Sequence, residues 1–301
     1  MFKPILKWVG GKTQIIEHLL NKFPKEIENY HEPFLGGGSV LFNLLNHVQE
    51  GTINVKNIYA SDSNEALIYV YKNIQSNHKV LYNELQKIIN EFNSINLNSI
   101  LNSIEITVNR NPQTLEEAKI SKESYYYFIR KQYNSFQDKK TIITSAYFIF
   151  LNKTCFRGLY RVGPNGFNVP YGNNKNPEII NEKHLEDISN LIQCVTFEHC
   201  DFTDSLKKVN IEDFVYLDPP YVPVNKDSFV DYTLDGFNET KHKLLFNCLK
   251  TAKYRYLMSN SNHPLIKEQF GEHAFYETIT AKRSINSKNP DSIVNELLVF
   301  N

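Results

Sequence analysis

The sequence has little cysteine, one tryptophan and no long hydrophobic run, and each shortage excludes a class of protein. Its four cysteines form no C-x-x-C pair and no cysteine–histidine cluster with zinc spacing, so we expect no metal site. Buried thiols in a reducing compartment are the simpler interpretation. No apolar stretch reaches the ~18 residues of a membrane span, and lysines and glycines interrupt the amino-terminal segment, unlike a signal peptide. We therefore expect a soluble, intracellular protein.

Net charge is also absent, because 33 lysines and arginines balance 33 aspartates and glutamates. This balance argues against a protein that coats phosphates regardless of sequence, although it permits a local basic cleft. Among the 301 residues, 41% are hydrophobic, with 20 phenylalanines and 18 tyrosines. That supply is enough for one large domain, or for one domain that carries a substantial insert.

What the sequence does contain is a series of short apolar runs that end in Gly, Asp or Asn, which is typical of parallel strands. Helical patterns with apolar residues three and four apart lie between them. This alternation predicts a doubly wound α/β sheet that binds ligands at the carboxyl ends of its strands. The predicted strands are 30–34, 58–60, 195–197, 214–217, 254–258, 275–279 and 296–300, and the predicted helices are 13–23, 39–47, 65–75, 240–251 and 264–270.

The alternation fails in the middle of the chain. We therefore predict one domain made of residues 1–78 and 192–301, and a mostly helical insert at 79–191 that packs on the sheet without joining it. The insert contains, in order, a helical stretch at 81–104, an aromatic stretch at 125–128, an apolar helix at 142–151 and a loop-like segment at 152–177.

The sharpest chemical signal is Asp218-Pro219-Pro220-Tyr221 at the end of an apolar strand. An aromatic amine is a poor nucleophile, because its lone pair is delocalised into the ring. A carboxylate and a backbone carbonyl, here those of Asp218 and Pro219, can accept its two N–H groups, and prolines hold the carbonyl rigidly. Tyr221 could lie flat on a base that has left the duplex. The alternative is a proline-rich turn in which Asp218 has no chemical role.

Two further strand ends carry weaker signals. Residues 34–39, Phe-Leu-Gly-Gly-Gly-Ser, combine a tight turn with the free N–H groups of a helix start, which suits a nucleotide or an ordinary structural turn. Asp62 ends the second predicted strand, where an acid can bind the hydroxyls of a ribose. The competing interpretation is that Asp62 is only the N-cap of the helix that follows.

A fourth motif, Lys-Trp-Val-Gly-Gly-Lys at 7–12, places the single tryptophan between lysines and beside two glycines. Trp8 could cover an apolar or cationic group of a ligand, and Lys12 could meet a carboxylate. A buried tryptophan with solvated lysines is the alternative. The spacing does not match a P-loop.

Taken in order, the four motifs resemble those of the adenine-specific DNA methyltransferases of the alpha group, the class related to GATC adenine methylases. In that group a glycine-rich motif comes first, a target-recognition insert follows, and DPPY comes later, as here. The resemblance covers essentially the whole chain. It implies a Rossmann-like class I methyltransferase sheet and site-specific methyl transfer from S-adenosylmethionine to the N6 of an adenine in double-stranded DNA, with S-adenosylhomocysteine as the product.

The resemblance also assigns roles to residues. It makes Asp218, Pro219, Pro220 and Tyr221 catalytic, and it requires no metal. The residues that it places at the cofactor are Trp8, Gly10, Gly11, Lys12, Phe34, Gly36, Gly38, Asp62, Asp201, Phe202 and Asp218.

Within the insert, residues 152–161 and 166–172 resemble the recognition hairpin of the group, in which an arginine reads a guanine and an aromatic residue enters the base stack. By position these are Arg161 and Phe156, and arginine to guanine is the commonest specific base contact. Without the resemblance, an ordinary surface loop would be the preferred interpretation. The predicted DNA-binding residues are Phe156, Arg157, Leu159, Arg161, Asn168 and Pro170.

Two departures from the GATC enzymes concern the recognised sequence. Arg157 stands where those enzymes usually carry an Asn, and the turn at 162–165 differs from theirs. The segment is more similar to CATG-type relatives, so CATG is favoured over GATC. A partner restriction endonuclease for the same site and a location in a bacterial cytoplasm or a virus-infected host cell are further implications, whereas the oligomeric state stays open.

Three other functions remain as alternatives. A methyltransferase for RNA or a protein amide would more often carry Asn in place of Asp218. An inactive relative would only bind DNA, although here every position of the catalytic motif is filled. A dinucleotide oxidoreductase would leave both DPPY and the motif at 7–12 unexplained.

Overall fold

The computed structural model describes residues 2–99, 108–174, 176–222, 237–282 and 293–301. The chain forms two compact units, each built from separate segments. We call them the helical unit and the sheet unit, and the chain passes from one to the other between Gly11 and Lys12 and between Leu35 and Gly36. The helical unit contains Met1–Gly11, Gly36–Phe42 and Asn64–Gln193, and the sheet unit contains Lys12–Leu35, Asn43–Ser63 and Cys194–Asn301.

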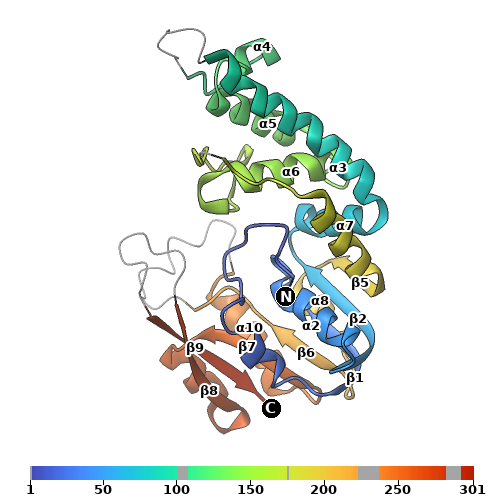
Figure 1. Ribbon diagram of the computed structural model, residues 1–301. Helices are drawn as coiled ribbons and strands as arrows, with labels where there is room; N and C mark the ends of the chain where they lie inside the picture. Colours follow the sequence, from blue (N-terminus) through green and yellow to red (C-terminus); the bar gives the residue numbers. More distant parts are fainter. Residues whose placement is uncertain (1, 100–107, 175, 223–236, 283–292) are drawn as a thin grey trace. The chain divides into compact units, whose positions relative to one another are not determined.

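A seven-stranded sheet forms the centre of the sheet unit (Figure 1). Its order is β5-β2-β1-β6-β7-β9-β8; the first five strands are parallel, and β9 is antiparallel to both of its neighbours. This sheet confirms the predicted α/β fold. The strands are β1 (Glu26–Glu32), β2 (Asn54–Asp62), β5 (Val195–His199), β6 (Phe214–Leu217), β7 (Arg255–Ser261), β8 (Phe275–Lys282) and β9 (Ile293–Phe300).

Both faces of the central strand β6 are covered, so all four of its residues are buried, as expected of a parallel strand in an α/β sheet. Val215 and Leu217 belong to an apolar cluster with side chains from three helices. On the other face, the ring of Phe23 lies 4.8 Å from that of Phe214 and 5.8 Å from that of Tyr216. The three helices are α8 (Phe202–Leu206), α10 (Glu239–Lys250) and α11 (Pro264–Phe270).

The strand boundaries differ from the predicted ones for identifiable reasons. The first strand begins at Glu26 and ends at Glu32, because Pro33 has no N–H with which to continue the ladder. The strand predicted at 254–258 continues to Ser261, where it still pairs with Glu296 of β9. Polar residues therefore occupy the end of this strand.

The helix predicted at 13–23 is mostly wrong, since only α1 (Ile16–Leu20) is helical there. Tight turns flank it: the N–H of Ile15 bonds to the carbonyl of Lys12, and that of Phe23 bonds to the carbonyl of Leu20. The helix predicted at 39–47 is α2 (Ser39–Gln49).

The helical unit contains the helices between residues 65 and 191. Its longest helix bends at Asn77, where φ is −153°, so the helical patterns at 65–75 and 81–104 belong to one interrupted helix; residues 100–104 lie outside the described residues. Side chains of Ser121, Thr141 and Asn181 cap the helices that follow them. The helices are α3 (Glu65–Ser99), α4 (Leu115–Ala118), α5 (Lys122–Ser135), α6 (Ile142–Thr154) and α7 (Glu182–Leu191).

The segment predicted as a loop at 152–177 contains regular structure. It includes the last turn of α6, a 3-10 turn (Phe156–Gly158) and an antiparallel hairpin of β3 (Val162–Gly163) and β4 (Gly166–Phe167). This hairpin does not join the seven-stranded sheet. The described part of the insert therefore adds no strand to that sheet.

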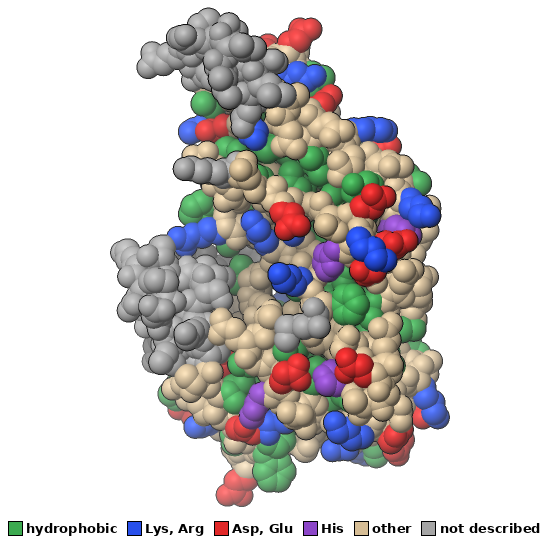
Figure 2. All heavy atoms as spheres, in the orientation of Figure 1, with side chains coloured by type: hydrophobic (Ala, Val, Ile, Leu, Met, Phe, Trp, Pro, Cys, Tyr) green, Lys and Arg blue, Asp and Glu red, His purple; other side chains and the backbone are tan. Residues whose placement is uncertain are grey.

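The surface and the cysteines bear on two other expectations. On the face in Figure 2, acidic and basic side chains are interspersed, in keeping with the balanced composition. None of the helices in the described ranges is both long and apolar enough to cross a bilayer.

The expectation of buried thiols is wrong for Cys194, which is exposed beside the start of β5. Only Cys155 is fully buried among the four cysteines.

Candidate active site

A buried ion pair lies at the carboxyl end of β6. The Nζ of Lys12 is 2.8 Å from Oδ2 of Asp218, and the two side chains are 2% and 19% exposed. The alternative of a solvated lysine is therefore wrong for Lys12. The carboxylate that this lysine meets belongs to the DPPY motif itself.

The surroundings of Asp218 shift its affinity for protons. Burial raises the pKa of the Asp218 carboxyl, Lys12 lowers it, and the negative charge of Glu296 adds to the rise, so that the pKa is about 6. Above about pH 6 the group is a carboxylate, which only accepts hydrogen bonds. At slightly alkaline pH the site thus holds the acceptor that an amine N–H requires.

Two polar residues of β7 anchor the turn that follows Asp218. The N–H of Val222 donates to Oδ1 of Asn260 (3.0 Å), and the hydroxyl of Ser261 donates to the carbonyl of Val222 (2.7 Å). The sequence alone assigned no role to Asn260. The signal that could have identified Asn260 and Ser261 is a polar run, Ser259 to Ser261, directly after an apolar one.

Tyr221 is held at both its ring and its hydroxyl. The hydroxyl donates to Oε2 of Glu296 on β9 (2.9 Å), and the Nζ of Lys12 lies over the ring, 4.9 Å from its centre. Sequence reasoning missed Glu296, because nothing near it in the sequence resembles a motif. The structure thus brings together Lys12, Asp218, Tyr221 and Glu296, which are far apart in the chain.

A group of three phenylalanines includes two predicted cofactor residues. Phe34 and Phe202 stack with their ring centres 5.5 Å apart, and the ring of Phe237 lies edge-on to Phe34 at the same distance. Because Phe34 and Phe202 contact each other, a flat ligand group would have to lie beside the pair and not between the two rings.

Asp201 has a structural role at the start of α8. Its Oδ1 accepts the N–H of Thr203 (3.0 Å) and caps the helix, and its Oδ2 lies 3.5 Å from the Nζ of Lys241. Although partial burial opposes it, hydrogen bonds from Thr203 and the charge of Lys241 lower the pKa of Asp201. An ionised Asp201 therefore follows β5, as Asp218 follows β6.

Asp62 ends β2, and the side chain of Asn64 provides a cap for the helix that follows. That helix begins at Glu65, and the side chain of Asn64 accepts the N–H of Leu67 (3.1 Å) as its cap.

In the helical unit, Trp8 packs directly on the glycine-rich loop. Gly36 has a φ of 50°, and a Cβ there would lie 2.9 Å from Cδ1 of Trp8. Gly38 has a φ of 71°, and a Cβ there would lie 3.1 Å from Cζ of Phe42. Both positions therefore require glycine. The ring of Trp8 also stacks on the ring of Tyr160, and the two ring centres are 5.6 Å apart.

Asn152 joins the amino-terminal motif to the predicted recognition segment. Its Oδ1 accepts the N–H of Lys7 (2.8 Å), and its Nδ2 donates to the carbonyl of Lys7 (2.7 Å). At Gly158, where φ is 64°, a Cβ would lie 2.4 Å from Cβ of Lys7. These two segments are consequently in close contact within the helical unit.

We expect the Asn152→Ala variant to be less stable by about 1–3 kcal/mol, because the substitution leaves both backbone groups of Lys7 unpaired beside a 3%-exposed position. Urea unfolding of the full chain measures this difference. Asn46→Ala is the matched control, since Asn46 bonds to Glu50 on the surface, and its effect should stay within about 0.5 kcal/mol. Equal effects of the two substitutions would contradict the role of Asn152.

The predicted DNA-binding residues contact one another, and the N–H of Leu159 donates to the carbonyl of Phe156 (3.2 Å). The N–H of Phe156 donates to the carbonyl of Pro170 (2.8 Å), and the guanidinium of Arg157 lies over the 44%-exposed ring of Phe156. Nε of Arg161 donates to Oδ1 of Asn168 (2.6 Å). Leu159, the sixth residue, is half-buried.

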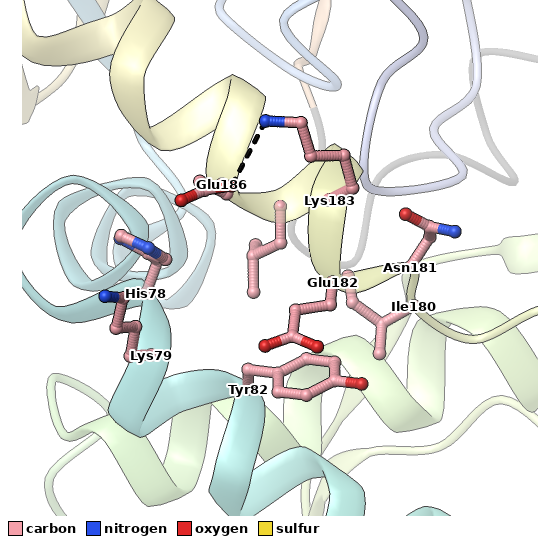
Figure 3. Close-up of a pocket in the computed structure, with 9 residues that line it drawn as sticks. His78, Lys79, Tyr82, Ile180, Asn181, Glu182, Lys183 and Glu186 are labelled. Atoms are coloured by element: carbon pink, nitrogen blue, oxygen red, sulfur yellow. Dashed lines mark hydrogen bonds and ion pairs between the residues drawn. The ribbon is translucent and has the colours of Figure 1, made fainter.

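Two cavities contain none of the DPPY residues. One of about 570 Å³ lies between α3 and α7 (Figure 3), and its lining mixes acidic and basic side chains, including the ion pair of Lys183 with Glu186 at 3.1 Å. Another of about 190 Å³ lies beside the buried pair of His31 and Asp213 (3.1 Å) in the sheet unit. We assign no chemistry to either.

Comparison with known proteins gives a consistent result. Residues 8–285 match the family model described as D12 class N6 adenine-specific DNA methyltransferase. The chain is 37% identical to a type II methyltransferase, M.MjaIII, of Methanocaldococcus jannaschii, with 99% of each chain covered. It is 30% identical to the type II methyltransferase M1.LlaDCHI of Lactococcus lactis subsp. cremoris, covering 99% and 95%. A DNA adenine methylase of Haemophilus influenzae is 26% identical, covering 97% and 90%.

Proposed function

Because the chain belongs to the D12 class of N6 adenine-specific DNA methyltransferases, we propose that it methylates one adenine within a short double-stranded DNA sequence, with S-adenosylmethionine as the donor. The observation that carries this proposal is the Asp218 carboxylate at the end of β6, paired with Lys12 and next to Tyr221. The family membership confirms the predicted enzyme class. The roles of individual residues below are proposals.

In the proposed mechanism, the adenine amine donates one N–H to Asp218 and the other to the carbonyl of Pro219. These bonds would concentrate the lone pair on N6 for attack on the methyl group that S-adenosylmethionine would supply, with S-adenosylhomocysteine as the leaving group. The surplus N6 proton passes to the Asp218 carboxylate and then to water. Tyr221 stacks on the base, which must leave the duplex to reach the site. Positioning and electrostatics supply most of the acceleration.

The residues present suit a nucleoside cofactor. Gly10, Gly36 and Gly38 have positive φ, which lets a ligand approach the backbone closely, and Asp62 provides an acid for the ribose at the end of β2. In the sheet unit, Phe34 and Phe202 would offer an apolar surface to the adenine ring of the cofactor, and Asp201 precedes Phe202 directly in the chain. In the helical unit, Trp8 and Gly11 are the other residues that we propose for the cofactor. S-adenosylmethionine, when bound, supplies the electrophilic methyl group. The ion pair between Lys12 and Asp218 supports a role for Lys12 beside the carboxylate of Asp218.

The test is incubation with tritiated S-adenosylmethionine and unmethylated plasmid DNA, followed by sequencing that detects modified bases. We expect label as N6-methyladenine within one short motif. If the protein binds the cofactor but leaves DNA unlabelled, the substrate is RNA or a protein amide, or the chain is inactive. The names of two relatives, type II methyltransferases, support a restriction endonuclease partner, and protection of the methylated plasmid from that nuclease would test it.

We expect Arg157→Asn to alter the outer bases of the recognised site while preserving the fold. Arg157 has a φ of 57°, a conformation that Asn adopts more readily than Arg, and a good arginine–base contact contributes about 1–3 kcal/mol of discrimination. Methylation of a CATG site should therefore fall roughly 10-fold or more relative to GATC. The control is Arg110→Asn, because Arg110 pairs with Glu123. An unchanged site preference would exclude Arg157 from base reading.

A further inference from the structure

Glu296 lies on β9, beside the DPPY turn rather than within any recognised motif. β9 pairs with β7 and β8, and Glu296 is in register with Ser261 and Ile279. Three fully buried apolar residues, Leu297 to Val299, follow it. Glutamate is uncommon in strands, and its carboxylate here accepts the hydroxyl of Tyr221 at 2.9 Å.

We propose that Glu296 is a positioning residue for methyl transfer, which fixes the ring of Tyr221 through its hydroxyl and places a second negative charge near Asp218. This inference rests on the proposed function, because it assumes that Tyr221 stacks on the adenine and that Asp218 accepts its amine. Glu296 itself touches no reacting atom.

The position of the Tyr221 ring is fixed from two directions. Lys12 lies over the ring face, and Glu296 holds the hydroxyl at the far end of the side chain. A tyrosine has only two side-chain torsions before the hydroxyl, so these two contacts leave little freedom for the ring. A ring already held in the stacking orientation loses less entropy when the base arrives.

The charge of Glu296 acts on Asp218 together with three other groups. Lys12, on the segment before α1, and the Tyr221 hydroxyl favour the carboxylate, whereas Glu296 on β9 disfavours it. Tyr216 on β6 also interacts electrostatically with Asp218. Because Glu296 makes Asp218 more basic, the carboxylate becomes a stronger acceptor for the amine, and its protonation occurs at higher pH.

The test measures kcat and KM across pH for Glu296→Gln and Glu296→Ala. Glu296→Gln keeps the size and an accepting oxygen but removes the charge, so the acid limb of kcat/KM should move to lower pH. Glu296→Ala also releases Tyr221, so kcat should fall roughly 10- to 100-fold, the worth of a hydrogen bond to a charged group. The KM for S-adenosylmethionine should change less than about twofold, because Glu296 is outside the proposed cofactor residues.

A double-mutant cycle separates this role from simple support of the fold. If Glu296 acts through the Tyr221 hydroxyl, Tyr221→Phe combined with Glu296→Ala should cost little more than the larger single loss. Glu277→Gln is the matched control, since Glu277 lies on β8 and pairs with His18 and Lys22, and it should leave the pH profile unmoved.

Two outcomes would overturn the inference: an acid limb that stays in place in Glu296→Gln, or losses that multiply in the double variant. Should Glu296→Ala fail to fold, Glu296→Gln and Tyr221→Phe still decide between these outcomes. A wild-type protein that transfers no methyl group to DNA would instead refute the proposed function. An active wild type with an unmoved limb refutes only the role of Glu296.

Discussion

Replacing Asp218 with asparagine should abolish methyl transfer while leaving the protein folded and able to bind its cofactor. The asparagine amide keeps one accepting oxygen, but it loses the negative charge that strengthens the hydrogen bond from the adenine amine, and it offers no carboxylate to the departing proton. A positioned proton acceptor contributes about 10²–10⁴-fold to rates. We therefore expect turnover at least about 1000-fold below that of the wild type.

Single-turnover methylation and equilibrium binding of S-adenosylmethionine test the two halves of this prediction separately. Asp213→Asn is the matched control, because Asp213 is also buried, at 1% exposure, but it pairs with His31 away from DPPY. The Asp213→Asn variant should be less stable than the wild type, but it should still transfer methyl groups below its melting temperature. Near-normal turnover of Asp218→Asn would remove Asp218 from the catalytic role.

The raised pKa of Asp218 gives activity and stability opposite dependences on pH. The folded protein binds the Asp218 proton more tightly than the unfolded chain, whose pKa is about 4. The contribution of this group to the free energy of unfolding therefore increases as pH falls through about 6, whereas activity decreases there. The difference between wild type and Asp218→Asn in urea unfolding, measured from about pH 8 to 5, isolates this contribution.

The sequence predicted those site residues that follow an apolar strand directly. Asp62 and Asp218 could be placed at strand ends because a parallel sheet presents the carboxyl ends of its strands at one edge, whatever the strand order. The glycines at 36 and 38 could be identified because each occupies a backbone conformation that other residues avoid. In both cases the necessary information is local in the chain.

The rest of the candidate site depends on long-range pairing. Glu296 reaches Tyr221 because β9 inserts antiparallel between β7 and β8, and no local pattern specifies that order. Asn260 could not be assigned for the same reason, although the polar run that contains it was visible. The contact of Lys7 with Asn152 likewise follows from the close approach allowed by Gly158, which only the folded chain shows.

The Lys12→Met variant should move the acid limb of activity to higher pH, opposite to Glu296→Gln. Lys12 lowers the pKa of Asp218 by its charge and its hydrogen bond, and a methionine of similar length removes both. The pKa then rises above about 6, and activity falls about tenfold for each unit by which it exceeds the assay pH. Raising the pH should restore part of the lost activity.

Stability distinguishes this effect from general damage. Removing one partner of a buried ion pair costs about 3–5 kcal/mol, but Asp218 can bind a proton instead, so the loss should be smaller near pH 6 than near pH 8. Lys22→Met is the matched control: Lys22 also pairs with a glutamate and lies over an aromatic ring, that of Phe300, at 4.7 Å. If both lysine variants lower activity equally at every pH, the pair of Lys12 and Asp218 supports the fold and has no part in setting the charge of the catalytic carboxylate.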